Sequence, residues 1–416
     1  LKVTKSITIQ AGQGAAGIGS ITTSGAVLET TADASAISNS GIYFIAGANG
    51  GNILFTAVEG NNVAYLTSLD AKYLVGLLAA SGSVTAQTFT NGSASISEVL
   101  ITAEMLHVNA ASGIDVRTEV QRAILQVTGI GNIVLTDNSA VILENVSSAD
   151  GSIWVHAFGD LTATSVTAQG TSEQNDITLI TQDPDGVGAT TANLILGTVS
   201  VNGLGDLTLN VQGNISWAGS GTVTADHLSV TLWSSLTLNT QTNSLSVETG
   251  APGDVSITQS GAATLDVVKV FVMDGSFTLT HAGGSVILQS VELATDRDSN
   301  DVSVTAGGDI QVGWIKAGTY DTSGSTARSS VGDVSLISGG SVTELSLDAE
   351  VDVIADDLTI SAVSGISGLE LAVNELLSLT TTNGNIEVND QDGAGEEYEG
   401  LLITKRKQYT KTTNSR

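Results

Sequence analysis

The sequence predicts an all-β chain that folds as a right-handed parallel β-helix, a β-solenoid with irregular turns of roughly 20–30 residues. Three observations favour this class: a short repeated motif, a near absence of proline and a low aromatic content. Among the 416 residues, 2 are Pro, 47 are Gly and 4% are aromatic. An array of β-sandwich domains is the alternative that these observations leave open.

The repeated motif is Gly, then Asp or Asn, then an apolar residue, any residue and another apolar residue. Alternation with a period of two predicts a strand with one buried face, and Gly with Asp or Asn before it predicts a turn. One such strand cannot bury its apolar face alone, but stacked copies form a continuous aliphatic core. Clear copies begin at Gly51, Gly131, Gly205, Gly213, Gly253, Gly308, Gly332 and Gly384.

The stretch 301–318, DVSVTAGGDIQVGWIKAG, shows the prediction for a single turn of the chain. Its alternation places four aliphatic side chains on the inward face, and the Gly307-Gly308 pair allows the chain to turn between two strands. Because Pro is confined to sheet edges and bulges, its near absence agrees with strands that lie inside long ladders. The predicted inward residues are Val302, Val304, Ile310 and Val312.

For the domain organisation, we predict one elongated β-solenoid over 1–404, followed by a basic polar tail over 405–416. The segment 95–127 carries more charge, which predicts a helical turn there, while 181–191 and 317–331 are predicted to be loops. The chain starts at Leu1 in a strand-like stretch, so we expect a piece of a longer protein.

Charge separates the last residues from the rest. The formal net charge is −29, and all 43 acidic residues precede residue 400. Such an acidic chain repels nucleic acid and anionic membrane surfaces, so we expect no nucleic-acid partner. The longest apolar run, 73–80, is shorter than the roughly 20 residues that span a bilayer. The basic tail is predicted to dock onto another copy through Lys405, Arg406, Lys407, Lys411 and Arg416.

Catalytic signatures are lacking in the sequence. With no Cys, the chain has no thiolate nucleophile, no Cys-zinc site and no disulfide. The four His residues are far apart, and no nucleophile elbow is present. We therefore predict that the chain is not an enzyme. The alternative is a polysaccharide-active β-helix, a lyase or a glycosidase with paired carboxylates. The four Trp residues are expected to pack in the core or at the ends of turns.

Two acidic segments are candidates for calcium, the one cofactor that the sequence indicates. Calcium takes six to eight oxygen ligands from carboxylates, amides and carbonyls, and both segments offer several of these within a short stretch. The other interpretation is that they are solvated turns, in which Asp and Asn are common. The candidate ligands are Asp296, Asp298, Asn300 and Asp301 in the first segment, and Asp390, Asp392, Glu396 and Glu397 in the second.

The repeated sequence of the kind seen at 301–313 resembles the β-helical repeat regions of giant bacterial surface proteins, including filamentous haemagglutinin-like adhesins. The resemblance covers most of the chain and transfers no functional residues. It implies an exported, extracellular shaft or fibre subunit at the cell surface, without catalytic activity. Its partners would be copies of itself or other chains of a surface assembly. The further alternative is a scaffold subunit of a larger cell-envelope complex.

Overall fold

The computed structural model is all-β and forms a β-solenoid of about 13 turns, which confirms the predicted fold class. It describes residues 101–184, 192–318, 331–348 and 350–390, together with the backbone of the strands before residue 101 and of 402–404; the side chains of Glu375, Leu377 and Asp390 are not described. Within these residues there is no helix. The chain divides into two compact units, Leu1–Ala225 and Asp226–Arg416.

The strands of the first unit are β1 (Lys2–Val3), β2 (Ser6–Gln10), β3 (Ile21–Ser24), β4 (Val27–Thr30), β5 (Gly41–Ile45), β6 (Ile53–Thr56), β7 (Val58–Gly60), β8 (Val63–Tyr65), β9 (Ser68–Ala79), β10 (Val84–Gln87), β11 (Ile101–Ala110), β12 (Ile114–Ile130), β13 (Ile133–Asp137), β14 (Val141–Asp150), β15 (Ile153–Phe158), β16 (Leu161–Ala168), β17 (Ile177–Gln182), β18 (Leu194–Val201), β19 (Leu207–Val211) and β20 (Ile215–Trp217). The boundary between the units falls within β21 (Val223–Leu232).

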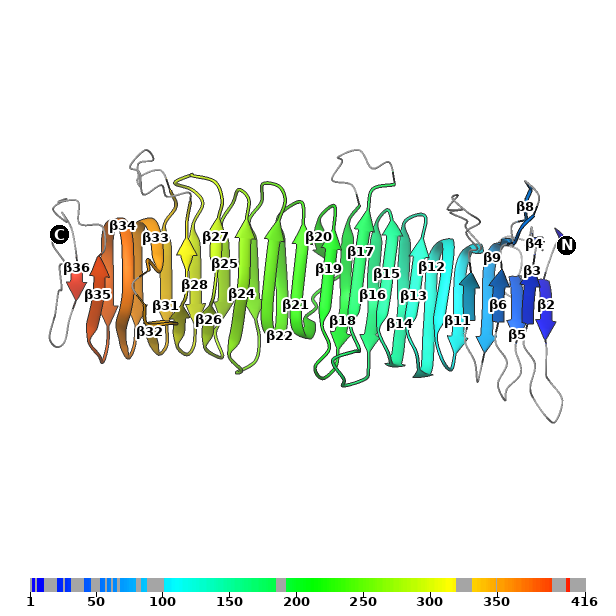
Figure 1. The fold of residues 1–416 in the computed structure, drawn as a ribbon, viewed down its shortest axis with the longest axis horizontal. Helices are drawn as coiled ribbons and strands as arrows, with labels where there is room; N and C mark the ends of the chain where they lie inside the picture. Colours follow the sequence, from blue (N-terminus) through cyan, green and yellow to red (C-terminus); the bar gives the residue numbers. More distant parts are fainter. Residues whose placement is uncertain are drawn as a thin grey trace. The chain divides into compact units, whose positions relative to one another are not determined.

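The strands of the second unit are β22 (Leu236–Thr249), β23 (Val255–Gln259), β24 (Leu265–Val272), β25 (Phe277–His281), β26 (Val286–Leu288), β27 (Val291–Leu293), β28 (Val302–Ala306), β29 (Ile310–Val312), β30 (Ile315–Lys316), β31 (Val334–Ser338), β32 (Ser341–Glu344), β33 (Val353–Ala362), β34 (Gly365–Thr381), β35 (Ile386–Asp390) and β36 (Leu402–Thr404). In both units each strand pairs in parallel with the equivalent strand of the next turn (Figure 1), whereas β7 and β8 pair antiparallel.

The core of each unit consists of aliphatic columns that run from turn to turn. In the first unit Ile133, Ile153 and Ile177 are register partners, and each is at most 1% exposed. In the second unit Phe277 and Val302 occupy the same position on paired strands and are fully buried. Parallel pairing in register places like side chains above one another, so the core is continuous within a unit. Hydrogen-bonded partners on neighbouring turns are as few as 17 and as many as 37 residues apart in sequence, as for Thr242 with Gln259 and Ile315 with Asp352.

The predicted inward face of 301–318 is confirmed. Val302, Val304, Ile310 and Val312 are each 0% exposed, and they belong to β28 and β29. The Gly307-Gly308 pair lies in the bend between these strands, as the sequence predicts.

The helical turn predicted within 95–127 is wrong for the described part of that segment. Residues 101–110 and 114–130 form β11 and β12, in which buried and more exposed positions alternate. The charges that suggested a helix lie on the outward side of these strands. The guanidinium of Arg122 on β12 pairs with Glu104 at 3.7 Å and with Glu144 at 2.9 Å, so one cation joins three turns.

Most of each predicted loop, 317–331 and 181–191, lies outside the described residues. Thr181 and Gln182 end β17, and Ala317 and Val331 are buried. The tryptophans differ from the expectation of core packing. Trp154, Trp217 and Trp314 are partly exposed, and Trp233 is 48% exposed. Trp233 directly follows β21, and its ring lies where a Cβ at Gly250 would approach it to 2.7 Å, so it packs beside this glycine.

The Asp and Asn residues of the repeated motif form a side-chain ladder, which is the name used below for side-chain oxygens that accept a backbone N–H from the next turn. Asp301 Oδ1 accepts the N–H of Asp333 at 3.1 Å, and Asp333 Oδ1 accepts that of Asp357 at 3.1 Å. Asn132 Oδ1 does the same for Ser152 at 2.9 Å in the first unit. Other acceptors in the ladder are Asp160, Asp176, Asn193, Asp254 and Asp309. The motif therefore joins successive turns as well as bending the chain.

Close approach of the backbone explains the glycine of the motif. At Gly332 a Cβ atom would overlap the carbonyl oxygen of Asn300 on the preceding turn, and at Gly384 it would overlap that of Ser364. Neither glycine has the positive φ that would itself require Gly. Gly is required at these positions because successive turns lie too close for a side chain, and not because of an unusual backbone conformation.

Candidate functional site

The residues of the first predicted calcium segment do not converge on one point. Asp298 lies beside Asp333 and Asp356, whereas Asp301 belongs to the side-chain ladder. Asn300 is 4% exposed, and its Nδ2 donates to Asp274 Oδ1 at 3.0 Å. Asp296 lies between β27 and β28 and is not part of the three-carboxylate group.

The second predicted segment and the tail are almost entirely outside the described residues. Only the backbone of Asp390 is described, at the end of β35. The residues that lie outside are Asp392, Glu396, Glu397, Lys405, Arg406, Lys407, Lys411 and Arg416.

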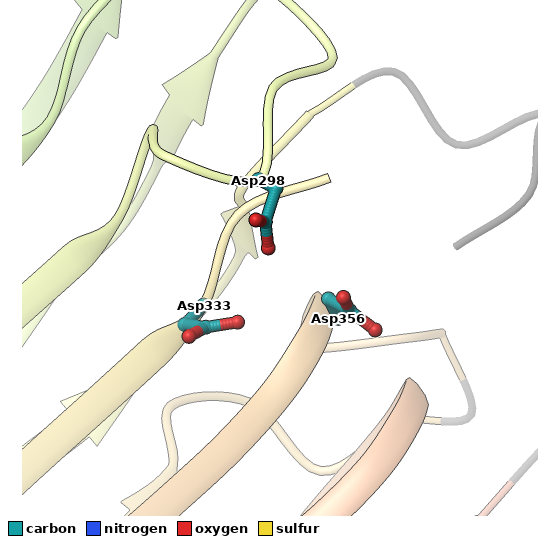
Figure 2. Close-up of side chains that lie close together, drawn as sticks. All are labelled: Asp298, Asp333 and Asp356. Carbon is teal, nitrogen blue, oxygen red and sulfur yellow. The ribbon is translucent and has the colours of Figure 1, made fainter. Parts of the chain in front are cut away.

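An aspartate cluster is formed by Asp298, Asp333 and Asp356, whose carboxylates come together from separate turns of the second unit (Figure 2). One oxygen of each residue lies within 4.8 Å of the others. Asp298 is exposed and the other two are half-buried. Burial raises the pKa of Asp333, and the charges of Asp301, Asp356 and Asp298 raise it further. The cluster offers oxygen ligands of the type that hard cations take.

A buried carboxyl cluster is formed by Glu344, Asp352 and Glu370, again with one oxygen of each within 4.8 Å of the others. Glu344 ends β32, Asp352 precedes β33 and Glu370 lies on β34. Glu344 is only 8% exposed and Asp352 only 4%, whereas Glu370 is half-buried. Two backbone N–H groups donate to the cluster: Asp348 to Glu344 Oε1 at 2.9 Å, and Glu370 to Asp352 Oδ2 at 2.8 Å.

One carboxylate oxygen of this cluster lacks a hydrogen bond. Glu370 Oε2 is buried without a hydrogen-bond partner. Burial raises the pKa of Asp352 to about 7 and also raises the pKa of Glu370, and the negative charge of Glu344 adds to both effects. Among the described residues, no Lys, Arg or His forms an ion pair with any of the three. The cluster therefore concentrates negative charge in a poorly solvated place, which favours protonation.

Asp137, at the end of β13, shows a different solution for a buried acid. It is 0% exposed, yet its oxygens accept hydrogen bonds from the N–H groups of Val120 and Ser139, at 3.0 and 2.9 Å, and from two hydroxyls. Burial raises its pKa to about 6, although these donors act in the opposite direction. We interpret it as a structural residue that joins β12 to the turn after β13.

A hollow of about 830 Å³ lies in the first unit beside Ile130, which is 78% exposed. Its polar lining is largely occupied by contacts between turns. Asn132 Oδ1 accepts the N–H of Ser152, and Ser152 Oγ in turn donates to the carbonyl of Gln174 at 2.6 Å. We therefore treat the hollow as part of the solenoid surface rather than as a substrate site.

The sequence analysis missed Asp333, Asp356, Glu344, Asp352 and Glu370 as cluster members. Asp333 follows Gly332 in a copy of the repeated motif, where the sequence indicates only a turn. What brings the five residues together is the register between turns, for which the sequence offers no local signal.

Comparison with protein-family models, with curated proteins and with solved structures gives no match. In the described residues there is no helix that is long and apolar enough to cross a membrane. The fold and the clusters are thus the basis on which a function can be proposed.

Proposed function

We propose that the chain is a structural shaft, an extracellular β-solenoid segment of a bacterial surface protein or filament. The observation that carries the proposal is the side-chain ladder, because it adds bonds between turns to those of the parallel strands. Together with the continuous aliphatic columns, such bonds resist bending and slippage between turns. The location at the cell surface rests only on the resemblance of the repeated sequence to bacterial surface proteins.

The competing function is a polysaccharide-active enzyme. A cleft for anionic sugars needs several free cations beside paired carboxylates. In the described residues most Lys and Arg side chains instead pair with acidic side chains of neighbouring turns: Lys269 with Glu248 at 3.1 Å and Lys316 with Glu292 at 3.0 Å. Arg117 donates to the amide oxygen of Asn138 on the next turn. This arrangement supports the structural proposal, since it uses the cations between turns.

Assembly through the basic tail is the first testable part of the proposal. We expect removal of residues 405–416 to lower the mass of the assemblies that form at high protein concentration, measured by size-exclusion chromatography with light scattering. The deletion leaves β36 (Leu402–Thr404) in place. Attraction between a basic tail and an acidic partner is screened by salt, so raising the salt concentration should act in the same direction.

The matched control for this experiment retains the length of the tail but neutralises Lys405, Arg406 and Lys407 to Gln. It should behave like the deletion. If the intact chain, the deletion and the neutralised variant give the same mass at low salt, docking through the tail is wrong, and a scaffold role with other chains becomes the better proposal.

Calcium remains a prediction, and Asp298 is the candidate ligand through which the structure allows it to be tested. We expect Ca²⁺ to raise the free energy of unfolding of the native chain more than that of Asp298→Asn, because binding to the folded state alone is stabilising. Asp266→Asn is the control, since its exposed carboxylate contacts the amide of Gln289 outside the cluster. Equal effects of Ca²⁺ on all three chains would exclude a site at Asp298.

A further inference from the structure

We propose that the buried carboxyl cluster of Glu344, Asp352 and Glu370 holds a shared proton, and that its loss weakens the turns built by β32, β33 and β34. The shaft would then carry a pH-sensitive joint near one end of its second unit, more firmly closed in acid than at alkaline pH.

The position of the cluster makes its charge matter to the contacts between turns. Asp352 donates its backbone N–H to the carbonyl of Glu370 at 2.8 Å and accepts the N–H of Ile315 at 2.7 Å. Its carboxylate accepts the N–H of Glu370 in the same place. Repulsion between the carboxylates therefore acts directly on the bonds that join three successive strands, β30, β33 and β34.

A glycine in β34 leaves space for the carboxyl groups of the cluster. Gly368 has a φ of +85°, and a Cβ atom there would lie 3.1 Å from the Cβ of Glu344 and 3.3 Å from its Oε2. A residue with a side chain would crowd Glu344 at this point. Glu370 Oε2 is buried in the same place without a hydrogen-bond donor. A proton held between the carboxyl groups would supply that donor.

The described groups that face the cluster offer no compensating positive charge. From β32 comes Glu344, from the segment before β33 come Asp348 and Asp352, and from β34 comes Glu370. Asn389 on β35 is neutral, and its hydrogen bond to Glu370 lowers the pKa of that carboxyl, against the larger effect of burial. Lys316 on the paired strand β30 is bonded to Glu292 instead. A proton between carboxylates converts one of them into a donor and removes one negative charge.

The direction of the pH effect follows from the raised pKa of Asp352, which burial and the two glutamates move from 3.8 to about 7. A group whose pKa is higher in the folded than in the unfolded state stabilises the fold fully below the unfolded pKa. That contribution is lost as the pH rises toward the folded value. The turns around the cluster should therefore weaken between about pH 4 and about pH 7.

Amide hydrogen exchange of the full chain tests the proposal, read for the peptides that contain β33 and β34, in EDTA at pH 5 and pH 8. After correction for the intrinsic exchange rate, we expect opening to be at least about tenfold more frequent at pH 8, since one pKa unit corresponds to a factor of ten. In Asp352→Asn the difference should largely disappear, because the amide keeps an acceptor for Glu370 without titrating. Glu370→Gln is a second variant with the same expectation.

Asp309→Asn is the matched control. Asp309 also accepts the N–H of a residue on the next turn, Ser341, but it is exposed, and that hydrogen bond lowers its pKa. Its substitution should leave the pH effect at β33 and β34 intact. The proposal is overturned if the native chain opens equally at both pH values. It is also overturned if added Ca²⁺ or Mg²⁺ makes the amides of β33 and β34 equally protected at pH 5 and pH 8. The cluster would then bind a cation rather than a proton.

Discussion

Replacing Gly332 with Ala should destabilise the second unit by about 3 kcal/mol or more, at or above the upper end of the usual cost of overpacking, because a methyl group is forced against rigid backbone. The new Cβ would overlap the carbonyl oxygen and carbon of Asn300 on the preceding turn. Neither atom belongs to a flexible side chain. Moving them would disturb the N–H of Gly332 that bonds to Ala317 and the ladder contact from Asp333 to Asp301. Urea unfolding followed by circular dichroism measures the change.

Gly261→Ala is the control for this prediction. A Cβ at Gly261 meets nothing within 4 Å, so only its φ of +96° opposes substitution. The expected cost there is about 1–2 kcal/mol. If Gly332→Ala were no more destabilising than Gly261→Ala, close packing of successive turns would not be what the glycine of the motif provides.

Phe277→Ala should cost about 3–5 kcal/mol, the usual range for removing a buried aromatic ring. Phe277 on β25 is among the largest fully buried side chains and stacks between Val255 and Val302 in the core column. The cavity would interrupt that column in the middle of the unit. The measurement is again the urea midpoint, with the slope of the transition checked for a change in cooperativity.

Phe271→Ala is the same chemical change on the neighbouring strand β24, at an outward position where the ring is only partly buried. The ammonium of Lys269 lies over the ring, 5.8 Å from its centre. We expect a loss of about 1 kcal/mol or less. Similar losses for Phe271→Ala and Phe277→Ala would contradict the assignment of inward and outward faces.

The sequence was sufficient to predict the fold because its main determinants are local. The alternation at Val302, Val304, Ile310 and Val312 is enough to define an inward face, whatever the neighbouring turns contain. The same locality explains the error at 95–127. Charge density alone suggested a helix there. The alternation along β12 shifts by one residue between Val120 and Ala123, which leaves Arg122 on the outward side.

The clusters could not be predicted because they depend on register between turns. Asp298 was identified from its acidic segment, but its neighbours Asp333 and Asp356 lie on later turns of irregular length. In the sequence, nothing distinguishes Asp352 from other acidic residues that precede a strand. Its burial and its raised pKa arise only when β32 and β34 place two glutamates beside it.

The central claim, that bonds between successive turns make this chain a stiff structural element, is tested most directly by electron microscopy of the purified full chain with calcium and with EDTA. The account predicts straight particles or filaments of uniform width in both conditions, because the side-chain ladder and the core columns occur in both units and need no cation. Compact globules, or particles that bend freely in either condition, would contradict it.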